Sequence, residues 1–113
     1  MKYLLLMYAN ESEAPEDMSG MYEAWTAYMT EANAAGVLLS NGGVAPGSSA
    51  TTLRIRDGKT LTTDGPFAET HEQFGGYSLI ECENLDEAMR WAEMIPTAKY
   101  GSIEIRPLWS PEQ

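Results

Sequence analysis

The chain carries its only histidine in a stretch rich in carboxylates, TDGPFAETHEQFGGY, which spans residues 63–77. Asp64 and His71 lie seven residues apart there, and Glu69 and Glu72 flank the histidine. An imidazole gives and takes protons near neutral pH, and a neighbouring carboxylate holds its tautomer and favours its charged form. Asp64 and His71 are therefore the candidate catalytic pair, with Asp64 as general base or orienting carboxylate and His71 as proton shuttle.

The same stretch also fits a plain structural loop. Proline fixes φ and lacks a backbone donor, and glycine relieves the backbone, so Asp64-Gly65-Pro66 disfavours regular structure. Phe67 is a large apolar group in a polar segment, and we expect it to anchor the loop to a core or to a partner. The alternatives to a catalytic pocket are a solvated acidic run with His71 on the surface, or a rigid turn that only seals a subunit contact.

Arginines on predicted strands are the candidate anchors for an anionic ligand. Arg54 and Arg106 each lie in the middle of a strand whose alternate residues are apolar, where a guanidinium can hold an anion with two hydrogen bonds. Arg56 adjoins a turn and is expected to be exposed. The alternative role for all three is to neutralise neighbouring carboxylates. Candidate walls of an apolar substrate pocket are Phe67, Tyr77 and Trp25.

Composition narrows the class of protein. A length of 113 residues suits one domain, residues 1–113, and a formal charge of -10 repels both a phosphate backbone and an anionic membrane surface. Cys82 is the only cysteine, which rules out an internal disulfide and a cysteine-rich metal site. No spacing supports a metal or another cofactor. The apolar segment 2–9 is too short to span a bilayer and lacks the features of a signal peptide, which predicts a cytoplasmic protein.

The hydrophobic pattern predicts the elements that would position these residues. A run that is apolar on both faces predicts a central strand, alternation predicts half-buried strands, and apolar residues at helical spacing predict two helices. The expected elements are a strand over 2–9, a helix within 19–36, a strand over 37–43, a hairpin over 51–63, a strand over 75–83, a helix within 84–95 and a strand over 102–109.

Local signals mark where these elements turn and end. Glycine or proline marks a turn, a bulge or an end in four of them, and a polar residue begins the second helix. The signals are Gly36 at a helix end, Asp57-Gly58 as a hairpin turn, Gly75-Gly76 as a bulge, Asn84 with Glu87 as a capping box, and Pro96 as a helix stop. The apolar helical stripes are Met21, Trp25, Tyr28, Met29 and Ala32 in the first helix, and Leu85, Ala88, Met89, Ala92 and Ile95 in the second.

The order β–α–β–hairpin–β–α–β favours an α+β fold, a ferredoxin-like split βαβ with an inserted β-hairpin. Both helices would then cover one face of the sheet. The first strand is apolar on both faces, so the other face would be bare in a monomer. We therefore expect a homodimer that packs sheet to sheet.

With these residues in view, the chain resembles the DGPF-domain branch of the YCII-related family. The run DGPFAET from Asp64 to Thr70, the opening KYLLLMY, the segment AAGVLLSNGG, the hairpin TTLRIRDGK, the helix LDEAMRWAEMIP and the closing SIEIRP carry the resemblance over nearly the whole chain. The resemblance implies a ferredoxin-like α+β fold that pairs as a dimeric α+β barrel.

The resemblance implies two classes of function. The wider family is enzyme-like, with a proposed histidine–aspartate pair in its other branch and a member linked to dechlorination of hydroxylated aromatics. The histidine of that branch belongs to the first helical region, and residues 19–35 contain none, so only Asp64 matches. The DGPF branch usually carries lysine at the position of His71. One hypothesis is thus a binder or enzyme for a small anionic or aromatic metabolite, and the alternative is a non-catalytic regulatory module that binds a sigma factor or another protein.

Overall fold

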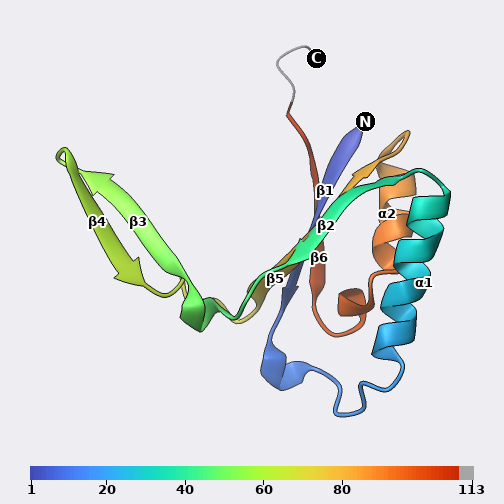
Figure 1. The fold of residues 1–113 in the computed structure, drawn as a ribbon, viewed down its shortest axis with the longest axis horizontal. Coiled ribbons are helices and arrows are strands. Elements are labelled where there is room, and N and C mark those ends of the chain that lie inside the picture. Colours follow the sequence, from blue (N-terminus) through green and yellow to red (C-terminus); the bar gives the residue numbers. More distant parts are fainter. Residues whose placement is uncertain (110–113) are drawn as a thin grey trace.

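The computed structural model describes residues 1–109 (Figure 1). Within these residues, six strands, two helices and three short 3₁₀ segments follow one another along the chain. The strands are β1 (Lys2–Ala9), β2 (Leu38–Gly43), β3 (Thr51–Arg56), β4 (Lys59–Asp64), β5 (Gln73–Glu81) and β6 (Ser102–Pro107); the helices are α1 (Met21–Ala34) and α2 (Leu85–Glu93); the 3₁₀ segments are Glu11–Glu13, Gly47–Ser49 and Pro96–Lys99. The predicted order of elements is confirmed.

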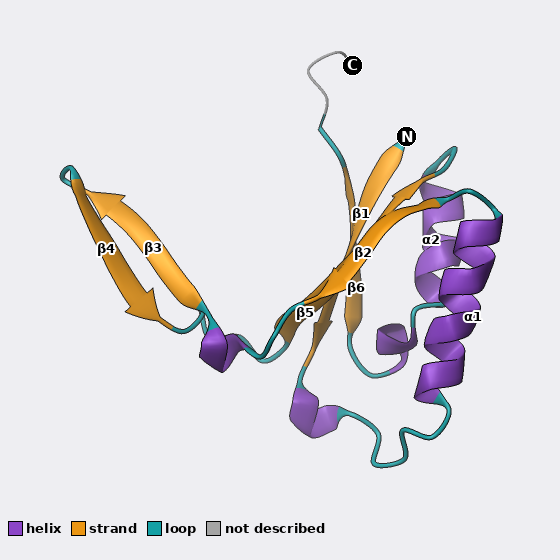
Figure 2. Ribbon diagram, viewed as in Figure 1, coloured by secondary structure: helices purple, strands orange, loops and turns teal. Residues whose placement is uncertain are grey.

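Four of the strands form one antiparallel sheet in the order β2-β5-β1-β6. Each helix connects two strands that are not neighbours, so the two βαβ units interleave, as a ferredoxin-like fold requires. Both helices lie on the same side of this sheet (Figure 2). The predicted α+β, ferredoxin-like fold is confirmed.

The core lies between this sheet and the two helices. Alternate residues of β1, namely Tyr3, Leu5 and Met7, are buried there, because successive side chains of a strand point to opposite faces. The helices contribute small or aromatic residues to the same core, which are Tyr28, Ala32, Ala88 and Ala92. The buried stripe is narrower than predicted, since Met29, Leu85 and Met89 are 36%, 49% and 43% exposed at the rims of the helices.

The ends of the helices follow local chemistry. Asn84 caps α2 by accepting a hydrogen bond from the backbone N–H of Glu87 at 2.9 Å, as predicted. The Glu87 carboxylate in turn accepts from the N–H of Glu83 at 2.9 Å, one residue before the expected capping-box partner. Gly36 follows α1 with φ +71°, the left-handed conformation that ends many helices. Pro96 opens a 3₁₀ segment after α2 has ended.

The hairpin of β3 and β4, residues 51–64, forms a separate two-stranded sheet that we call the arm. Its turn residues Asp57 and Gly58 have φ of 54° and 74°, the positive values of a type I′ turn. The arm projects from the body on the side away from the helices (Figure 1), and all of its residues except Thr52 are exposed. The radius of gyration is accordingly 16.3 Å, against about 13 Å for a compact chain of this length.

The second face of the four-stranded sheet has no cover among the described residues, and we call it the open face. Leu4, Leu6 and Tyr8 of β1 point to this face and are only half-buried, as are Tyr77 and Leu79 of the neighbouring β5. The register shift between Met7 and Tyr8 leaves Gly75 without a partner on β1, which confirms the predicted bulge. No helix within residues 1–109 is both long and apolar enough to cross a membrane.

Candidate functional site

Three hollows gather where β1 ends: Met7 and Ala9 of that strand line the first, and Tyr8 lines the second and the third. The first, which we call the Trp25 pocket, has a volume of about 440 Å³ and opens on the helix side of the sheet. Trp25 of α1 and Tyr100 after the Pro96–Lys99 segment form its aromatic walls, and its floor is made of glycines, which are Gly42, Gly43, Gly75 and Gly76. The Trp25 ring is held edge-on against Tyr28, at a centroid distance of 6.2 Å.

Glycine is needed where β2 and β5 meet below this pocket. A Cβ on Gly76 would lie 2.8 Å from the carbonyl oxygen of Gly42, closer than a carbon and an oxygen can approach. The ring of Tyr77 lies over Gly42, where a Cβ would meet the ring at 3.1 Å. Gly76 therefore lets the two strand backbones approach closely, whereas the space next to Gly42 is filled by the Tyr77 ring on the open face.

The second hollow, which we call the Phe67 cleft, has a volume of about 700 Å³ and lies between the end of the sheet and the base of the arm. Tyr8 and Phe74 form one wall, with ring centroids 5.7 Å apart and the rings inclined by 61°. Pro66, Phe67 and Ala68 also line the cleft. Most of its lining is apolar, as in sites for small organic molecules.

Two hydrogen bonds fix the loop that carries Phe67. The N–H of Gly65 donates to the carbonyl of Ala50 at 2.7 Å, which joins the two ends of the arm. The Thr52 hydroxyl donates to the carbonyl of Gly65 at 2.8 Å. Gly65 has φ +99°, a value that side chains rarely tolerate, so the Asp64-Gly65-Pro66 run turns the chain sharply at the mouth of the cleft.

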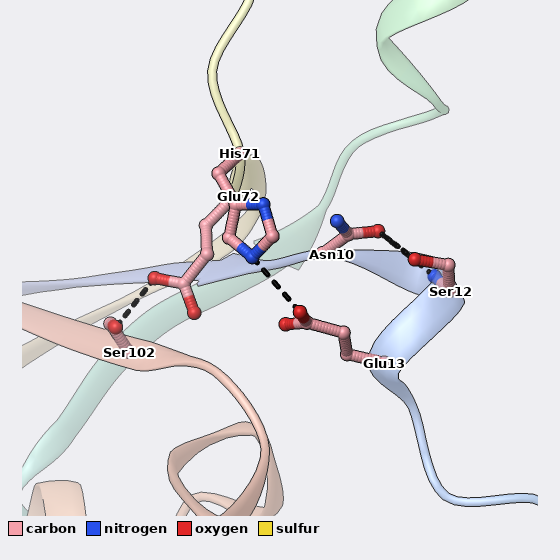
Figure 3. A network of polar contacts seen from close by, with 6 residues as sticks. All are labelled: Asn10, Ser12, Glu13, His71, Glu72 and Ser102. Carbon is pink, nitrogen blue, oxygen red and sulfur yellow. Dashed lines mark hydrogen bonds and ion pairs between the residues drawn. The ribbon is translucent and has the colours of Figure 1, made fainter.

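The third hollow, which we call the His71 hollow, adjoins the Phe67 cleft and shares Tyr8 and Thr70 with it. Figure 3 shows His71 and Glu72 pointing to different partners. The Nε2 atom of His71 lies 2.9 Å from Oε1 of Glu13, and the Ser102 hydroxyl donates to Glu72 at 2.6 Å. The His71 and Glu13 side chains are 72% and 48% exposed, so solvent screens their attraction strongly.

A short turn after β1 places Glu13 beside the imidazole of His71. The backbone N–H and the hydroxyl of Ser12 both donate to Oδ1 of Asn10, at 3.0 and 2.7 Å (Figure 3). The N–H of Glu13 donates to the carbonyl of Asn10 at 2.9 Å. The sequence analysis did not find Glu13, because it lies 58 residues from His71 and no local pattern relates the two.

The two residues of the predicted catalytic pair do not contact each other. Asp64 ends β4 at the base of the arm, opposite Thr51, and is exposed. Within residues 1–109, no hydrogen bond or ion pair joins Asp64 to His71, and the carboxylate that contacts the imidazole is that of Glu13. Neither Asp64 nor His71 lines the Phe67 cleft, although their near neighbours Pro66 and Thr70 do.

The other predicted site residues are spread over the three hollows and the arm. Phe67, 79% exposed, lines its cleft, whereas Trp25 and Tyr77 line the Trp25 pocket. Arg54 lies on the exposed arm, and Nε of Arg106 lies 3.4 Å from a Glu104 carboxylate oxygen on the same strand. Sequence reasoning missed Tyr8, which was read only as a strand residue, and Phe74, which lies directly before the predicted strand 75–83.

Within the described part of the chain, no group of three or more His, Cys, Asp or Glu side chains is arranged to hold a metal ion. Cys82 is buried, and burial raises the pKa of its thiol, with the Glu87 carboxylate adding to the effect. A thiol that stays protonated is a poor nucleophile. The chemistry that this region can offer is therefore binding of an apolar ring, with carboxylates and an imidazole at its edges.

Comparisons with known proteins add three findings. The YCII-related domain matches residues 1–111. An uncharacterised protein of Rhizobium meliloti (strain 1021) is 38% identical over 114 residues, which cover 96% of this chain and 92% of that protein. The solved structure of 5-chloro-2-hydroxyhydroquinone dehydrochlorinase (TftG) from Burkholderia phenoliruptrix AC1100, in complex with 2,5-dihydroxybenzoquinone, is similar with a TM-score of 0.51. That similarity covers 99% of this chain and 97% of the other at 13% identity, so it concerns the fold alone.

Proposed function

The chain belongs to the YCII-related family, and from this premise we propose that it is a homodimer that binds a small aromatic molecule in the Phe67 cleft. The observation that carries the proposal is the cleft itself, with a volume of about 700 Å³ and a lining in which Tyr8, Phe67 and Phe74 supply three aromatic rings. Clefts of roughly 300–1,000 Å³ with mostly apolar walls are typical of small-molecule sites. The run from Asp64 to Thr70 supports a place in the DGPF branch of the family.

The ligand class is supported by the fold. The structure of TftG, which shares this fold, contains a hydroxylated benzoquinone. A planar ring of that size would pack between the Tyr8–Phe74 wall and Phe67, and its oxygens would reach the polar edges of the cleft. We therefore propose a hydroxylated aromatic compound, with an anionic form held by Arg54 or Arg106.

The proposed chemistry is proton transfer beside the cleft. Asp64 would act as general base or orienting carboxylate beside Gly65 and Pro66, and His71 as proton shuttle from the adjoining hollow. The contact of the His71 ring with Glu13 supports this role, because a carboxylate at one ring nitrogen orients the imidazole. Trp25 and Tyr77 would line a second binding pocket behind the wall formed by Gln73 and Phe74.

The homodimer is supported by the open face. Leu4, Leu6 and Leu79 are half-buried in a single chain, and apolar side chains in such a contiguous face gain most when a second sheet covers them. Face-to-face packing of two such sheets makes a dimeric α+β barrel. In that arrangement the Phe67 cleft lies beside the subunit contact, because Tyr8 belongs to the same face.

Calorimetric titration with 2,5-dihydroxybenzoquinone tests the proposed site. We expect saturable binding to the wild-type chain, and an affinity that is roughly tenfold lower or worse for Phe67→Ala because one wall of the cleft is lost. Asp64→Asn is expected to keep the fold, judged by circular dichroism, and to lose binding. Tyr22→Ala is the matched control, since Tyr22 is an aromatic residue on α1 that is 81% exposed.

Two results would contradict the proposal. If the wild-type chain shows no saturable binding, the proposed ligand class is wrong. If Phe67→Ala and Tyr22→Ala lower the affinity equally, the cleft is not the binding site. An Asp64→Asn chain that unfolds would make Asp64 a structural residue of the turn.

A second candidate function is a non-catalytic dimeric module that binds a basic protein, such as a sigma factor. The formal charge of -10 favours it, because a strongly acidic surface accelerates association with a basic partner. This candidate predicts capture of one protein from a lysate, with binding that weakens as salt is added. A pull-down that retains no protein at low salt would count against it.

A further inference from the structure

We propose that the arm of each copy contacts the other copy in the dimer. Its Leu53 and Ile55 pack against the open face of the second copy. The inference rests on the homodimer of the proposed function and adds which segment stabilises that dimer. It also makes the Phe67 cleft a shared site, because a second copy seated on the open face would cover the exposed side of that cleft.

The arm has an apolar face with nothing to pack against in its own chain. Pairing of β3 with β4 places Leu53 and Ile55 on one face, opposite Thr62 and Thr60, and these two apolar side chains are 60% and 62% exposed. The core cluster of the described residues contains no arm residue. A two-stranded hairpin is marginally stable by itself in water, so this one needs a surface on which to pack.

The open face offers an apolar surface on the correct side of the molecule. The helices cover one side of the four-stranded sheet, and the arm stands on the other side (Figure 1). A second copy that covers Leu4, Leu6 and Leu79 would therefore come within reach of the arm. The contact repeats itself by two-fold symmetry, since each copy supplies both an arm and an open face.

The chain exposes more surface than a compact monomer of its mass, as expected if part of that surface is buried in a dimer. The accessible surface is 7912 Å² for 12.4 kDa, whereas a compact monomer of that mass exposes about 6,100 Å². The excess of about 1,800 Å² exceeds the roughly 800 Å² that each partner buries in a standard interface. Permanent homodimers bury areas of this larger size.

The distribution of charge identifies a second copy as the partner. The arm carries three basic residues, Arg54, Arg56 and Lys59, and two acidic ones, Asp57 and Asp64, which gives it a formal charge of +1. The chain as a whole has -10, so the remaining residues carry -11. The arm is thus opposite in sign to the rest of the chain taken together, and it would be attracted by the carboxylates of another copy of the body.

Sedimentation velocity in physiological salt tests the inference on the full chain. We expect a dimer for the wild-type chain, and for Leu53→Asp/Ile55→Asp a dissociation constant that is higher by roughly a hundredfold or more, because two charges enter an apolar contact. Leu85→Asp/Met89→Asp is the matched control: it adds the same charges at apolar side chains of α2 that are 49% and 43% exposed. Circular dichroism confirms that each variant is folded.

Each result has a defined meaning. A wild-type dimer that weakens only in the arm variant supports the inference. A dimer that is equally stable in the arm variant would overturn the role of the arm and leave the proposed homodimer intact. Equal weakening in the control would also overturn it, since added charge alone would then explain the effect. A wild-type monomer would overturn both the arm contact and the homodimer.

Discussion

At the scale of single residues, the core contains two hydroxyl groups whose hydrogen-bonding capacity is unused within the described part of the chain. They are those of Tyr28 and Ser78, both fully buried. Burial raises the pKa of the Tyr28 hydroxyl, and the neighbouring Ser78 hydroxyl acts in the opposite direction, although the two groups do not meet the geometry of a hydrogen bond. A buried hydroxyl without a partner costs about 1–3 kcal/mol, so the Tyr28 ring stabilises the fold through its apolar surface and not through its oxygen.

Removal of that oxygen should therefore be harmless. We expect Tyr28→Phe to leave the free energy of unfolding unchanged or to raise it by up to about 1 kcal/mol, and Tyr28→Ala to lower it by about 3–5 kcal/mol through the cavity it leaves. Urea denaturation of both variants beside the wild-type chain measures the difference. A loss of more than about 2 kcal/mol in Tyr28→Phe would show that the hydroxyl has a partner on which the fold depends.

At the scale of elements, the contact between β2 and β5 depends on glycine. Gly76 pairs with Gly43 and packs its Cα against the backbone of β2, whereas Gly75 is the bulged residue on the other side of the strand. The nearest atom to a Cβ on Gly75 would be the Met7 carbonyl oxygen at 4.0 Å. Two adjacent glycines thus have different roles, one in strand contact and one in the bulge.

Alanine substitutions at Gly75 and Gly76 test the bulge and the strand contact separately. We expect Gly76→Ala to lower the free energy of unfolding by about 2–3 kcal/mol, since two backbones must move apart. Gly75→Ala, with open space around its Cβ, is expected to change it by less than about 1 kcal/mol. Thermal and urea unfolding of the two variants provides the comparison. Equal losses would mean that the strands do not meet as closely at Gly76 as the structure shows.

At the scale of the whole molecule, the body and the arm differ in how they are stabilised. The body has a core of its own, built from the sheet and both helices, while the arm has backbone pairing and exposed side chains. A chain of this shape exposes apolar surface on the open face and on the arm at once. Association of two copies would bury both, so stability and association should be coupled.

This coupling predicts a melting temperature that depends on protein concentration. For a dimer that unfolds to monomers, the wild-type melting temperature should rise by several degrees, on the order of 5 °C, over a hundredfold increase in concentration. The melting temperature of the Leu53→Asp/Ile55→Asp chain should change less over the same range of concentration, because its dimer is weaker. Differential scanning calorimetry at both ends of the range measures this, and a constant wild-type value would contradict a folded dimer.

The sequence by itself determined the elements, with ends that differ by up to two residues from those in the structure, such as α2, which ends at Glu93 before the predicted stop at Pro96. The periods of apolar residues identified both helices and all six strands, and the Asn84 cap, the Asp57-Gly58 turn and the bulge at Gly75 follow from the chemistry of those residues. Such features depend on neighbours within a few positions, so a local pattern is enough to predict them. The ferredoxin-like topology followed from their order, because right-handed connections leave few alternatives.

Only the tertiary structure decided which side chains meet. His71 contacts Glu13, and the predicted pocket walls divide between two hollows, with Phe67 in one and Trp25 and Tyr77 in the other. The arm stands away from the body, so Asp64 lies at its base and not beside the imidazole. These placements depend on strand register and on the path of loops between distant segments, and the propensity of a residue for helix, strand or turn contains no information about either.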